Sequence, residues 1–337
     1  MARHTLAELV ELEKILALGG PRIETRRVRE IEVESQRFPV YAASMGSKDP
    51  QAPAIAFVGG IHGIEKIGTQ VILAFMRSLL ARMKWDRVLQ HQLEHVRMVF
   101  MPLVNPGGMW LHRRCNPQGV DLMRNAPIES AERVAFMVGG QRISHRLPWY
   151  RGNEDAPMEA ENQAVAEVIE NELLNRRFSL VLDCHSGFGL RDRIWFPYAF
   201  SRRPFKHLAE VLALKELLDH TYPAHPYLFE PQCHQYLTHG DLWDYLSEQR
   251  QHREDNVFLP LTLELGSWLW IKKNPRQLLS FTGLFNPTVP HRHQRVLRGH
   301  MLWLEFLTRA VIAHEHWRPG AEARWNHHRH ACATWYA

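Results

Sequence analysis

Short apolar segments of strand length alternate with longer segments of helical periodicity along most of this chain. The predicted strands cover residues 54–58, 96–104, 180–182, 194–199 and 257–265, and the predicted helices cover residues 64–83, 158–178, 205–220, 240–251 and 294–317. Strands separated by helices form mostly parallel sheets. We therefore expect an α/β fold with a mixed, mostly parallel central sheet and helices on both faces. Sites in such sheets form at the carboxyl ends of the strands.

The chain of 337 residues is long enough to form one large domain. We expect a single domain over residues 1–317, in which residues 1–50 form an N-terminal helix and edge strands. Residues 126–155 lack periodicity, which predicts a long ordered loop near a site. Residues 318–337 are polar and rich in histidine, which predicts a poorly ordered C-terminal tail.

Composition excludes several classes of protein. The formal charge of +5 is spread over the chain without a long basic block, so nucleic acid is not an expected partner. No apolar run approaches the roughly 20 residues that a membrane helix needs, so we expect no membrane partner. The four cysteines are scattered and no signal-peptide pattern is present, which favours free thiols and a cytoplasmic location. The oligomeric state stays open.

Candidate metal ligands follow two of the predicted strands. The strand at residues 54–58 runs through two glycines into His62 and Glu65, three residues apart, and the strand at residues 180–182 runs into Asp183 and His185. Imidazole and carboxylate groups are good ligands for zinc. Each pattern alone also fits a structural role, as a helix-start ion pair or a capped histidine. Asp183 either orients the His185 ring or caps the strand end.

Two further segments carry chemistry. Glu264 lies in one of the most apolar strands, where an isolated carboxylate needs a charged partner, a metal or a raised pKa. It is either half of a structural ion pair or a general base beside a metal. Between residues 105 and 125, Arg114 and Arg124 lie in a segment that leaves another strand end. Arginines there either clamp a carboxylate or an oxyanion, or stay solvated in a turn.

Taken together, these segments resemble the zinc carboxypeptidase family (peptidase family M14). That family carries an HxxE pair, a distant histidine after a strand, an Asn-Pro-Gly turn, a GVDLNRN segment and a late glutamate in a TxE strand. The same elements occur here in the same order over residues 55–266, and residues 150–161 are similar to the family's YxG…P…SEPE stretch. The resemblance implies the family's zinc carboxypeptidase-like fold.

The resemblance also implies roles for individual residues. His62, Glu65 and His185 would hold one Zn²⁺ per chain, Glu264 would be the general base, and Arg114 would stabilise the oxyanion. The substrate-binding residues would be Arg124, which holds the terminal carboxylate, together with Asn125 and Tyr236. The family's tyrosine falls among Tyr227, Tyr236 and Tyr245, of which we favour Tyr236. Met123 stands where the family has asparagine, so carboxylate recognition is expected to differ.

The implied function is hydrolysis of a C-terminal peptide bond by metal-activated water. The expected partner is a peptide or acyl-amino-acid substrate with a free carboxylate. Two alternatives use the same chemistry: an N-acyl amino acid deacylase, as in the aspartoacylase and succinylglutamate desuccinylase group, and a murein peptide amidase. A third alternative is an inactive zinc-binding homologue that acts as a binding module. Glu264 and Arg114 argue against it, because an inactive homologue tends to lose such residues.

Overall fold

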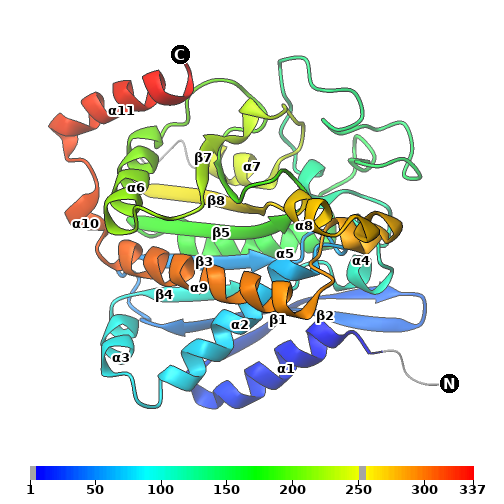
Figure 1. Cartoon of the computed structure of the whole chain (residues 1–337), viewed down its shortest axis with the longest axis horizontal. Coiled ribbons are helices and arrows are strands. Elements are labelled where there is room, and N and C mark those ends of the chain that lie inside the picture. Colours follow the sequence, from blue (N-terminus) through cyan, green and yellow to red (C-terminus); the bar gives the residue numbers. More distant parts are fainter. Residues whose placement is uncertain (1–4, 250–255) are drawn as a thin grey trace.

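An eight-stranded sheet organises the structure, a computed structural model that describes residues 5–249 and 256–337. The strand order is β1-β2-β4-β3-β5-β8-β6-β7 (Figure 1). The strands are β1 (Glu24–Val33), β2 (Gln36–Gly46), β3 (Ala54–Gly59), β4 (Arg97–Met101), β5 (Phe178–Ser186), β6 (Arg193–Phe196), β7 (Leu228–Pro231) and β8 (Val257–Leu265).

The four central strands β4, β3, β5 and β8 run parallel to one another. Every residue of β3, β4, β5 and β8 is buried, as expected for parallel strands covered on both faces. The β1–β2 hairpin joins one side antiparallel to β4, and β6 joins the other side antiparallel to β8. The predicted mixed, mostly parallel α/β sheet is confirmed.

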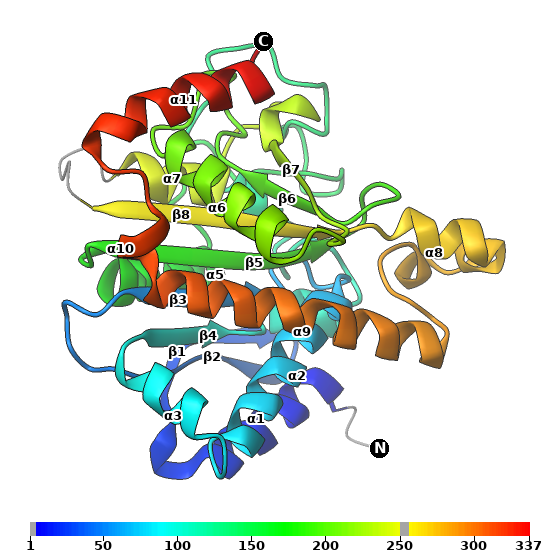
Figure 2. The ribbon, with the colours of Figure 1, turned by 60° about the vertical axis from the view of Figure 1, so that its left-hand side comes forward.

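Helices cover both faces of the sheet (Figures 1 and 2). On one face α2 and α9 pack on β3 and β5, and α1 packs on α2, whereas α5 and α7 lie on the other face. The longer helices are α1 (Ala7–Gly19), α2 (Lys66–Arg82), α3 (Arg87–Glu94), α5 (Ala160–Ile169), α6 (Leu208–Thr221), α7 (Leu242–Glu248), α9 (Pro290–Ile312) and α11 (Ala321–Trp335). The short helical segments are η1 (Gly20–Arg22), α4 (Pro106–Trp110), η2 (Leu122–Arg124), η3 (Glu170–Leu174), η4 (Gln232–His234), α8 (Trp268–Lys273), η5 (Pro275–Leu279), η6 (Phe281–Leu284) and α10 (His314–Trp317). No helix in these described ranges is long and apolar enough to cross a membrane.

The close packing of α2 on β5 brings two strand ends together. Gly68 in α2 lies so near β5 that a Cβ atom there would overlap the carbonyl oxygen of Cys184. Glycine is therefore required at this approach. Glu65 directly precedes α2 and His185 directly follows Cys184, so this contact sets the spacing between their side chains.

The expected boundaries differ from the structure in several places. The tail prediction is wrong, because α11 packs on α6 and buries Ala331 and Trp335. The predicted helix at 158–178 is α5 continued by the π-helical segment η3, and it ends before β5. The elements α3 and β7 were not predicted. The end of the predicted helix at 240–251 lies outside the described residues, and α7 accounts for its described part.

Candidate active site

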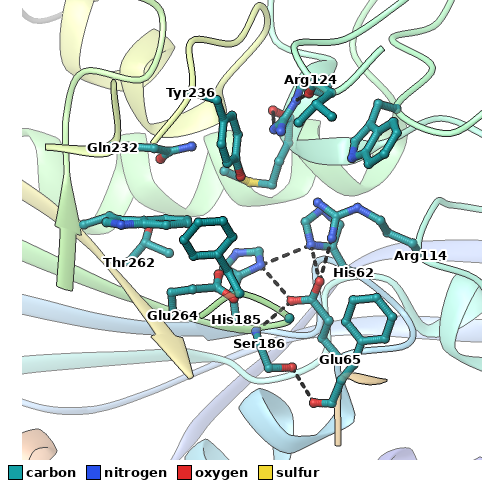
Figure 3. A pocket seen from close by; sticks show the side chains of 17 residues that line it. His62, Glu65, Arg114, Arg124, His185, Ser186, Gln232, Tyr236, Thr262 and Glu264 are labelled. Carbon is teal, nitrogen blue, oxygen red and sulfur yellow. Dashed lines mark hydrogen bonds and ion pairs between the residues drawn. The ribbon is translucent and has the colours of Figure 1, made fainter. Parts of the chain in front are cut away.

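A cavity of about 320 Å³ opens at the carboxyl ends of the parallel strands (Figure 3). Its wall combines charged groups with many large apolar side chains. It is lined by His62, Glu65, Arg114, Met123, Arg124, Val138, Trp149, His185, Ser186, Gly187, Phe188, Trp195, Gln232, Tyr236, Thr262, Glu264 and Phe285. Val138 and Trp149 come from the segment 126–155, so that segment does form part of a site, as the sequence predicts.

Three predicted ligands meet at one side of this cavity. The Nδ1 atoms of His62 and His185 lie 3.1 Å apart. Glu65 reaches both rings, with Oε1 3.0 Å from His62 Nδ1 and Oε2 3.1 Å from His185 Nδ1. A tetrahedral zinc site with bonds of about 2.0–2.1 Å has ligand-to-ligand edges of about 3.3 Å. The donor types and their separations therefore fit a single divalent ion.

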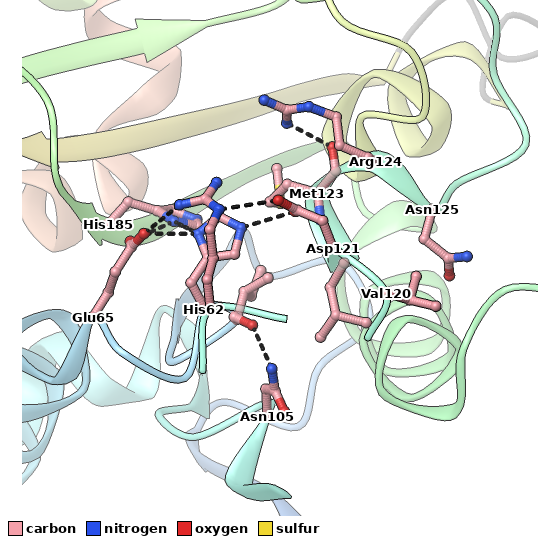
Figure 4. A network of polar contacts seen from close by, with 12 residues as sticks. His62, Glu65, Asn105, Val120, Asp121, Met123, Arg124, Asn125 and His185 are labelled. Carbon is pink, nitrogen blue, oxygen red and sulfur yellow. Dashed lines mark hydrogen bonds and ion pairs between the residues drawn. The ribbon is translucent and has the colours of Figure 1, made fainter. Parts of the chain in front are cut away.

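A carboxylate lies behind each of the two imidazole rings, and Figure 4 shows the one behind His62, which is that of Asp121. His62 Nε2 lies 3.1 Å from Asp121 Oδ1, and His185 Nε2 lies 2.6 Å from Asp183 Oδ2. The indole Nε1 of Trp243 donates to the same Asp183 oxygen at 2.8 Å. A carboxylate at Nε2 favours the proton there and leaves the Nδ1 lone pair free to bind a metal. Of the two readings for Asp183, the structure supports orientation of His185.

The electrostatics of this centre favour a cation. Burial alone would lower the pKa of His185, but the carboxylates of Asp183 and Glu65 outweigh burial and raise that pKa well above its ordinary value. Burial likewise works against ionised Glu65, yet His62, His185 and Arg114 hold the pKa of Glu65 below its ordinary value. The carboxylate therefore stays charged, and positive charge is stabilised between the two rings.

Glu264 lies beside this centre, and its pKa is raised whereas that of Glu65 is lowered. It pairs with His185 in the register of β5 and β8, so its side chain reaches the same strand ends. Burial, together with the nearby charge of Glu65, raises the pKa of Glu264 to about 8. A carboxyl group with a raised pKa beside a candidate metal centre has the chemistry of a general acid or base.

Two arginines border the cavity in different ways. Arg114 donates from Nη1 to Glu65 Oε1 at 2.7 Å and from Nε to Asp121 Oδ2 at 3.0 Å. Arg124 is buried on the opposite wall, where it donates to the carbonyl oxygens of Val138 and Met123. The Arg114 guanidinium therefore lies at the ligand cluster, and the Arg124 guanidinium lies across the cavity from it (Figure 3).

Tyr236 is the predicted tyrosine that lines the cavity, with its ring 5.7 Å from the Arg124 guanidinium. Burial raises the pKa of Tyr236. Tyr227 instead contacts His300 through its hydroxyl, at 2.9 Å. Tyr245 borders a different hollow of the surface.

Asn125, which was predicted to bind substrate, is not among the residues that line the cavity. Asn125 follows the short helix η2 and its side chain turns away from the cavity. Its amide donates to the carbonyl oxygen of Arg151 and accepts from the backbone N–H of Glu159. Adjacent residues at the end of a tight turn point in different directions. Met123 and Arg124, which directly precede Asn125, do line the cavity. Asn125 instead connects the long loop to the start of α5.

Sequence reasoning assigned no role to several residues that shape the site. Asp121 contacts both His62 and Arg114, and it is an acid within an otherwise apolar run between two arginines, which is a usable signal. Trp243, Trp195 and Gln232 carry no such signal. They come from α7, β6 and η4, which only the tertiary structure brings to this end of the sheet.

The fold and the cavity define a class: an α/β protein with a candidate metal centre of two histidines and one glutamate at the strand ends. The sequence profile described as zinc carboxypeptidase matches residues 19–254. Since this match covers more than half of the chain, the chain belongs to the zinc carboxypeptidase family, peptidase family M14, whose members are hydrolases.

Individual relatives are distant. Carboxypeptidase D of Anas platyrhynchos is 24% identical over 216 residues, which cover 60% of this chain and 13% of that protein. The carboxypeptidase N catalytic chain of Rattus norvegicus is 28% identical over 270 residues, which cover 69% of this chain and 54% of that protein. The chain therefore spans well under two thirds of the length of these relatives.

Solved structures share the fold. Thrombin activatable fibrinolysis inhibitor (TAFI) aligns with a TM-score of 0.66 and 18% identity, over 90% of this chain and 74% of that chain. Carboxypeptidase A from Helicoverpa armigera aligns with a TM-score of 0.64 and 16% identity, over 90% of this chain and 71% of that chain. At such identities these likenesses concern the fold alone.

Proposed function

We propose that this protein is a zinc-dependent metallocarboxypeptidase that hydrolyses the C-terminal peptide bond of its substrate. The carrying observation is the convergence of two imidazole Nδ1 atoms and one carboxylate within 3.1 Å of one another at a cavity that also contains Glu264 and two arginines. His62, Glu65 and His185 would hold the zinc. A zinc ion bound there would act as a Lewis acid that lowers the pKa of a water molecule to about 7 and polarises a carbonyl group.

The remaining chemistry falls to side chains around the centre. In its ionised form Glu264 accepts a proton from the attacking water, and it then delivers this proton to the nitrogen of the leaving amine. Arg114 has five N–H groups, of which two are used by Glu65 and Asp121, so further donors are available for the oxyanion that forms at the scissile carbon. Asp121 and Asp183 keep the two histidine rings in place through the reaction.

The far wall of the cavity is suited to a terminal carboxylate. Arg124 is buried there, donates to two carbonyl oxygens and lies beside the Tyr236 ring, and it forms no ion pair at salt-bridge distance within the described residues. A substrate carboxylate would accept forked hydrogen bonds from the N–H groups of Arg124 that the two carbonyl oxygens do not use. Met123 contributes only a sulfur where the family has an amide, so the anchor depends more heavily on Arg124.

The same wall suits an uncharged terminal side chain. The carboxylates in the lining are Glu65 and Glu264, both at the metal centre, and the remainder includes Trp149, Trp195 and Phe188. A buried ammonium group without a carboxylate partner costs several kcal/mol. We therefore expect kcat/KM for peptides that end in phenylalanine to exceed that for peptides ending in lysine by at least about tenfold.

Hydrolysis of matched peptides tests the proposal. The zinc-loaded protein should cleave an N-acylated dipeptide with a free carboxylate, and a chelator should abolish the cleavage. Blocking that carboxylate as an amide should lower kcat/KM at least about a hundredfold, and Arg124→Lys should remove most of this preference because lysine lacks the forked donors. Arg146→Gln, at an exposed arginine of the neighbouring loop 126–155, is the control and should change nothing.

The outcomes separate the candidate functions. Cleavage of N-acyl amino acids or murein peptides in place of ordinary peptides would redirect the proposal to a deacylase or an amidase. Equal cleavage of the free and the amidated peptide would reject Arg124 as the carboxylate anchor. Stoichiometric zinc without hydrolysis of any of these substrates would favour the inactive homologue.

A further inference from the structure

A second functional surface lies beside the mouth of the cavity. Between residues 265 and 304 the sequence has six lysine and arginine residues and no aspartate or glutamate. The part of this stretch that comprises α8, η5, η6 and the first turns of α9, residues 268–298, is here called the basic-apolar segment. Figure 2 shows α8 and the start of α9 extending away from the end of the sheet.

Large apolar side chains of the basic-apolar segment point into solvent. Leu279 is 91% exposed, Leu278 61%, Phe281 60% and Trp268 47%. They come from three successive short helical segments rather than from the wall of one groove. These three segments contact one another, so their exposed apolar groups gather on one part of the surface. Gathered apolar groups mark an interaction surface, whereas isolated ones are common on any protein.

The same segment also carries exposed positive charges. Lys272, Lys273, Arg276, Arg295 and Arg298 are exposed, and none of them forms an ion pair with any residue in the described ranges. Arg292, the sixth cation, donates to the carbonyl oxygens of Trp270 and Lys273. The segment therefore presents unneutralised positive charge together with exposed apolar side chains.

The basic-apolar segment is continuous with the cavity. The indole Nε1 of Trp268 donates to the carbonyl oxygen of Gly187 at 2.9 Å, and its ring packs on Phe188 with centroids 5.4 Å apart. Phe281 packs on Phe285, with centroids 5.7 Å apart. Gly187, Phe188 and Phe285 all line the cavity. Whatever the segment binds is therefore held next to the cavity mouth.

We propose that the basic-apolar segment binds the surface of a membrane that contains anionic lipids. Lysine and arginine beside exposed leucine, phenylalanine and tryptophan are typical of segments that lie in the lipid interface without crossing it. The cations meet anionic headgroups while the apolar side chains enter the acyl boundary. A folded protein partner would need a surface complementary in shape to these side chains. A fluid lipid interface needs none, so it is the better partner for apolar side chains that project separately. The proposal departs from the sequence-based expectation of no membrane partner, which rested on the lack of an apolar run long enough to span a membrane, because a surface contact needs no such run.

Vesicle cosedimentation of the full chain tests this proposal. We expect the protein to bind vesicles with about 30% phosphatidylglycerol in phosphatidylcholine at low salt, and to bind phosphatidylcholine alone at least tenfold more weakly. Raising the salt to about 0.5 M should reduce the binding, since exposed charges are screened. The Leu278→Ser/Leu279→Ser and Lys272→Gln/Lys273→Gln variants should each bind at least tenfold more weakly.

A matched variant controls for exposed apolar groups in general. Leu18 and Val88 are 73% and 68% exposed and lie in α1 and α3, far from α8 in both views. The Leu18→Ser/Val88→Ser variant should bind like wild type, and circular dichroism melting should show that all variants fold. Absence of wild-type binding, equal binding to neutral vesicles, or unchanged binding by the segment variants would each overturn the proposal. Binding to polyglutamate but not to vesicles would instead assign the surface to an acidic protein.

Discussion

Two groups of histidine and glutamate in this molecule have the same composition and opposite surroundings. His62, Glu65 and His185 are all buried at the strand ends, whereas His91, Glu94 and His95 are all exposed on α3. In each group the candidate ligand atoms lie within 4.8 Å of one another. Side-chain exposure is 3% for His62 and 2% for Glu65, against 72% for His91 and 70% for Glu94.

The surroundings of the two groups decide their chemistry. In the buried group each imidazole has a carboxylate at Nε2, and the donors face a cavity. In the exposed group the rings of His91 and His95 pack against each other, and Glu94 contacts His91 at 3.2 Å. Flexible exposed side chains lose conformational entropy on binding a metal, but fixed buried ones have already lost it on folding. Donor composition alone therefore does not make a metal centre.

Removing one ligand from each group should give the largest contrast. We expect His62→Ala to lose the tightly bound zinc, about one ion per chain, together with at least about four orders of magnitude in hydrolysis. His91→Ala should keep both. Elemental analysis after dialysis against a weak chelator measures the metal. If the His62→Ala variant kept its zinc and the His91→Ala variant lost it, the exposed group rather than the buried group would be the metal site.

Replacing Glu264 separates catalysis from metal binding. Glu264→Gln should keep about one zinc per chain, because Glu264 is not among the three converging donors, while kcat falls at least about a thousandfold through loss of the general base. Glu94→Gln in the exposed group is the control and should leave kcat unchanged. An active Glu264→Gln enzyme would remove Glu264 from the mechanism.

A smaller effect is expected from the carboxylates behind the rings. Asp183→Asn removes the charge 2.6 Å from His185 Nε2, and the affinity for zinc should fall about 10- to 100-fold in a chelator competition. Asp219→Asn is a matched control, since Asp219 contacts His225 Nε2 at 2.7 Å away from the cavity. Equal affinities for the two variants would show that Asp183 has no role at the metal.

A buried carboxylate without a cation should affect stability rather than activity. Glu161 is buried, its Oε1 has no hydrogen-bond partner among the described residues, and burial raises its pKa from 4.5 to about 7. As the pH rises through this window the unfolded chain releases the proton first, so the free energy of unfolding falls from pH 4.5 to 7. At 1.36 kcal/mol per pH unit the loss amounts to about 3 kcal/mol at most.

Glu161→Gln should remove this loss. Its stability relative to wild type should be higher at pH 8 than at pH 5 by about 2 kcal/mol in denaturant unfolding. Glu167→Gln is the control, because Glu167 lies in the same helix α5 but contacts Arg26 and Arg29 at the surface. A relative stability of Glu161→Gln that does not change between the two pH values would mean that Glu161 is ionised in the folded protein.

The sequence predicted the central strands well because their apolar runs are long and fully buried. It missed β7, a strand of four residues whose first residue is half-exposed, since a run so short carries no clear period. It also missed α11, because a polar helix that buries only Ala331 and Trp335 resembles a tail in composition. From the sequence, Asn125 and its neighbour Arg124 were equally good candidates for substrate binding. Only the geometry of the turn at the end of η2 directs the two side chains to different places.

By itself the sequence determined which residue types end which strands: His62 and Glu65 after β3, His185 in β5, and Glu264 in β8. This follows from local pattern, because the periodicity of apolar residues sets both the strands and their ends. Only the tertiary structure decided which nitrogen of each ring faces the cavity, which carboxylate lies behind it, and which aromatic side chains close the far wall. Those contacts join residues up to 123 positions apart, as between His62 and His185, and long-range packing rather than local pattern brings them together.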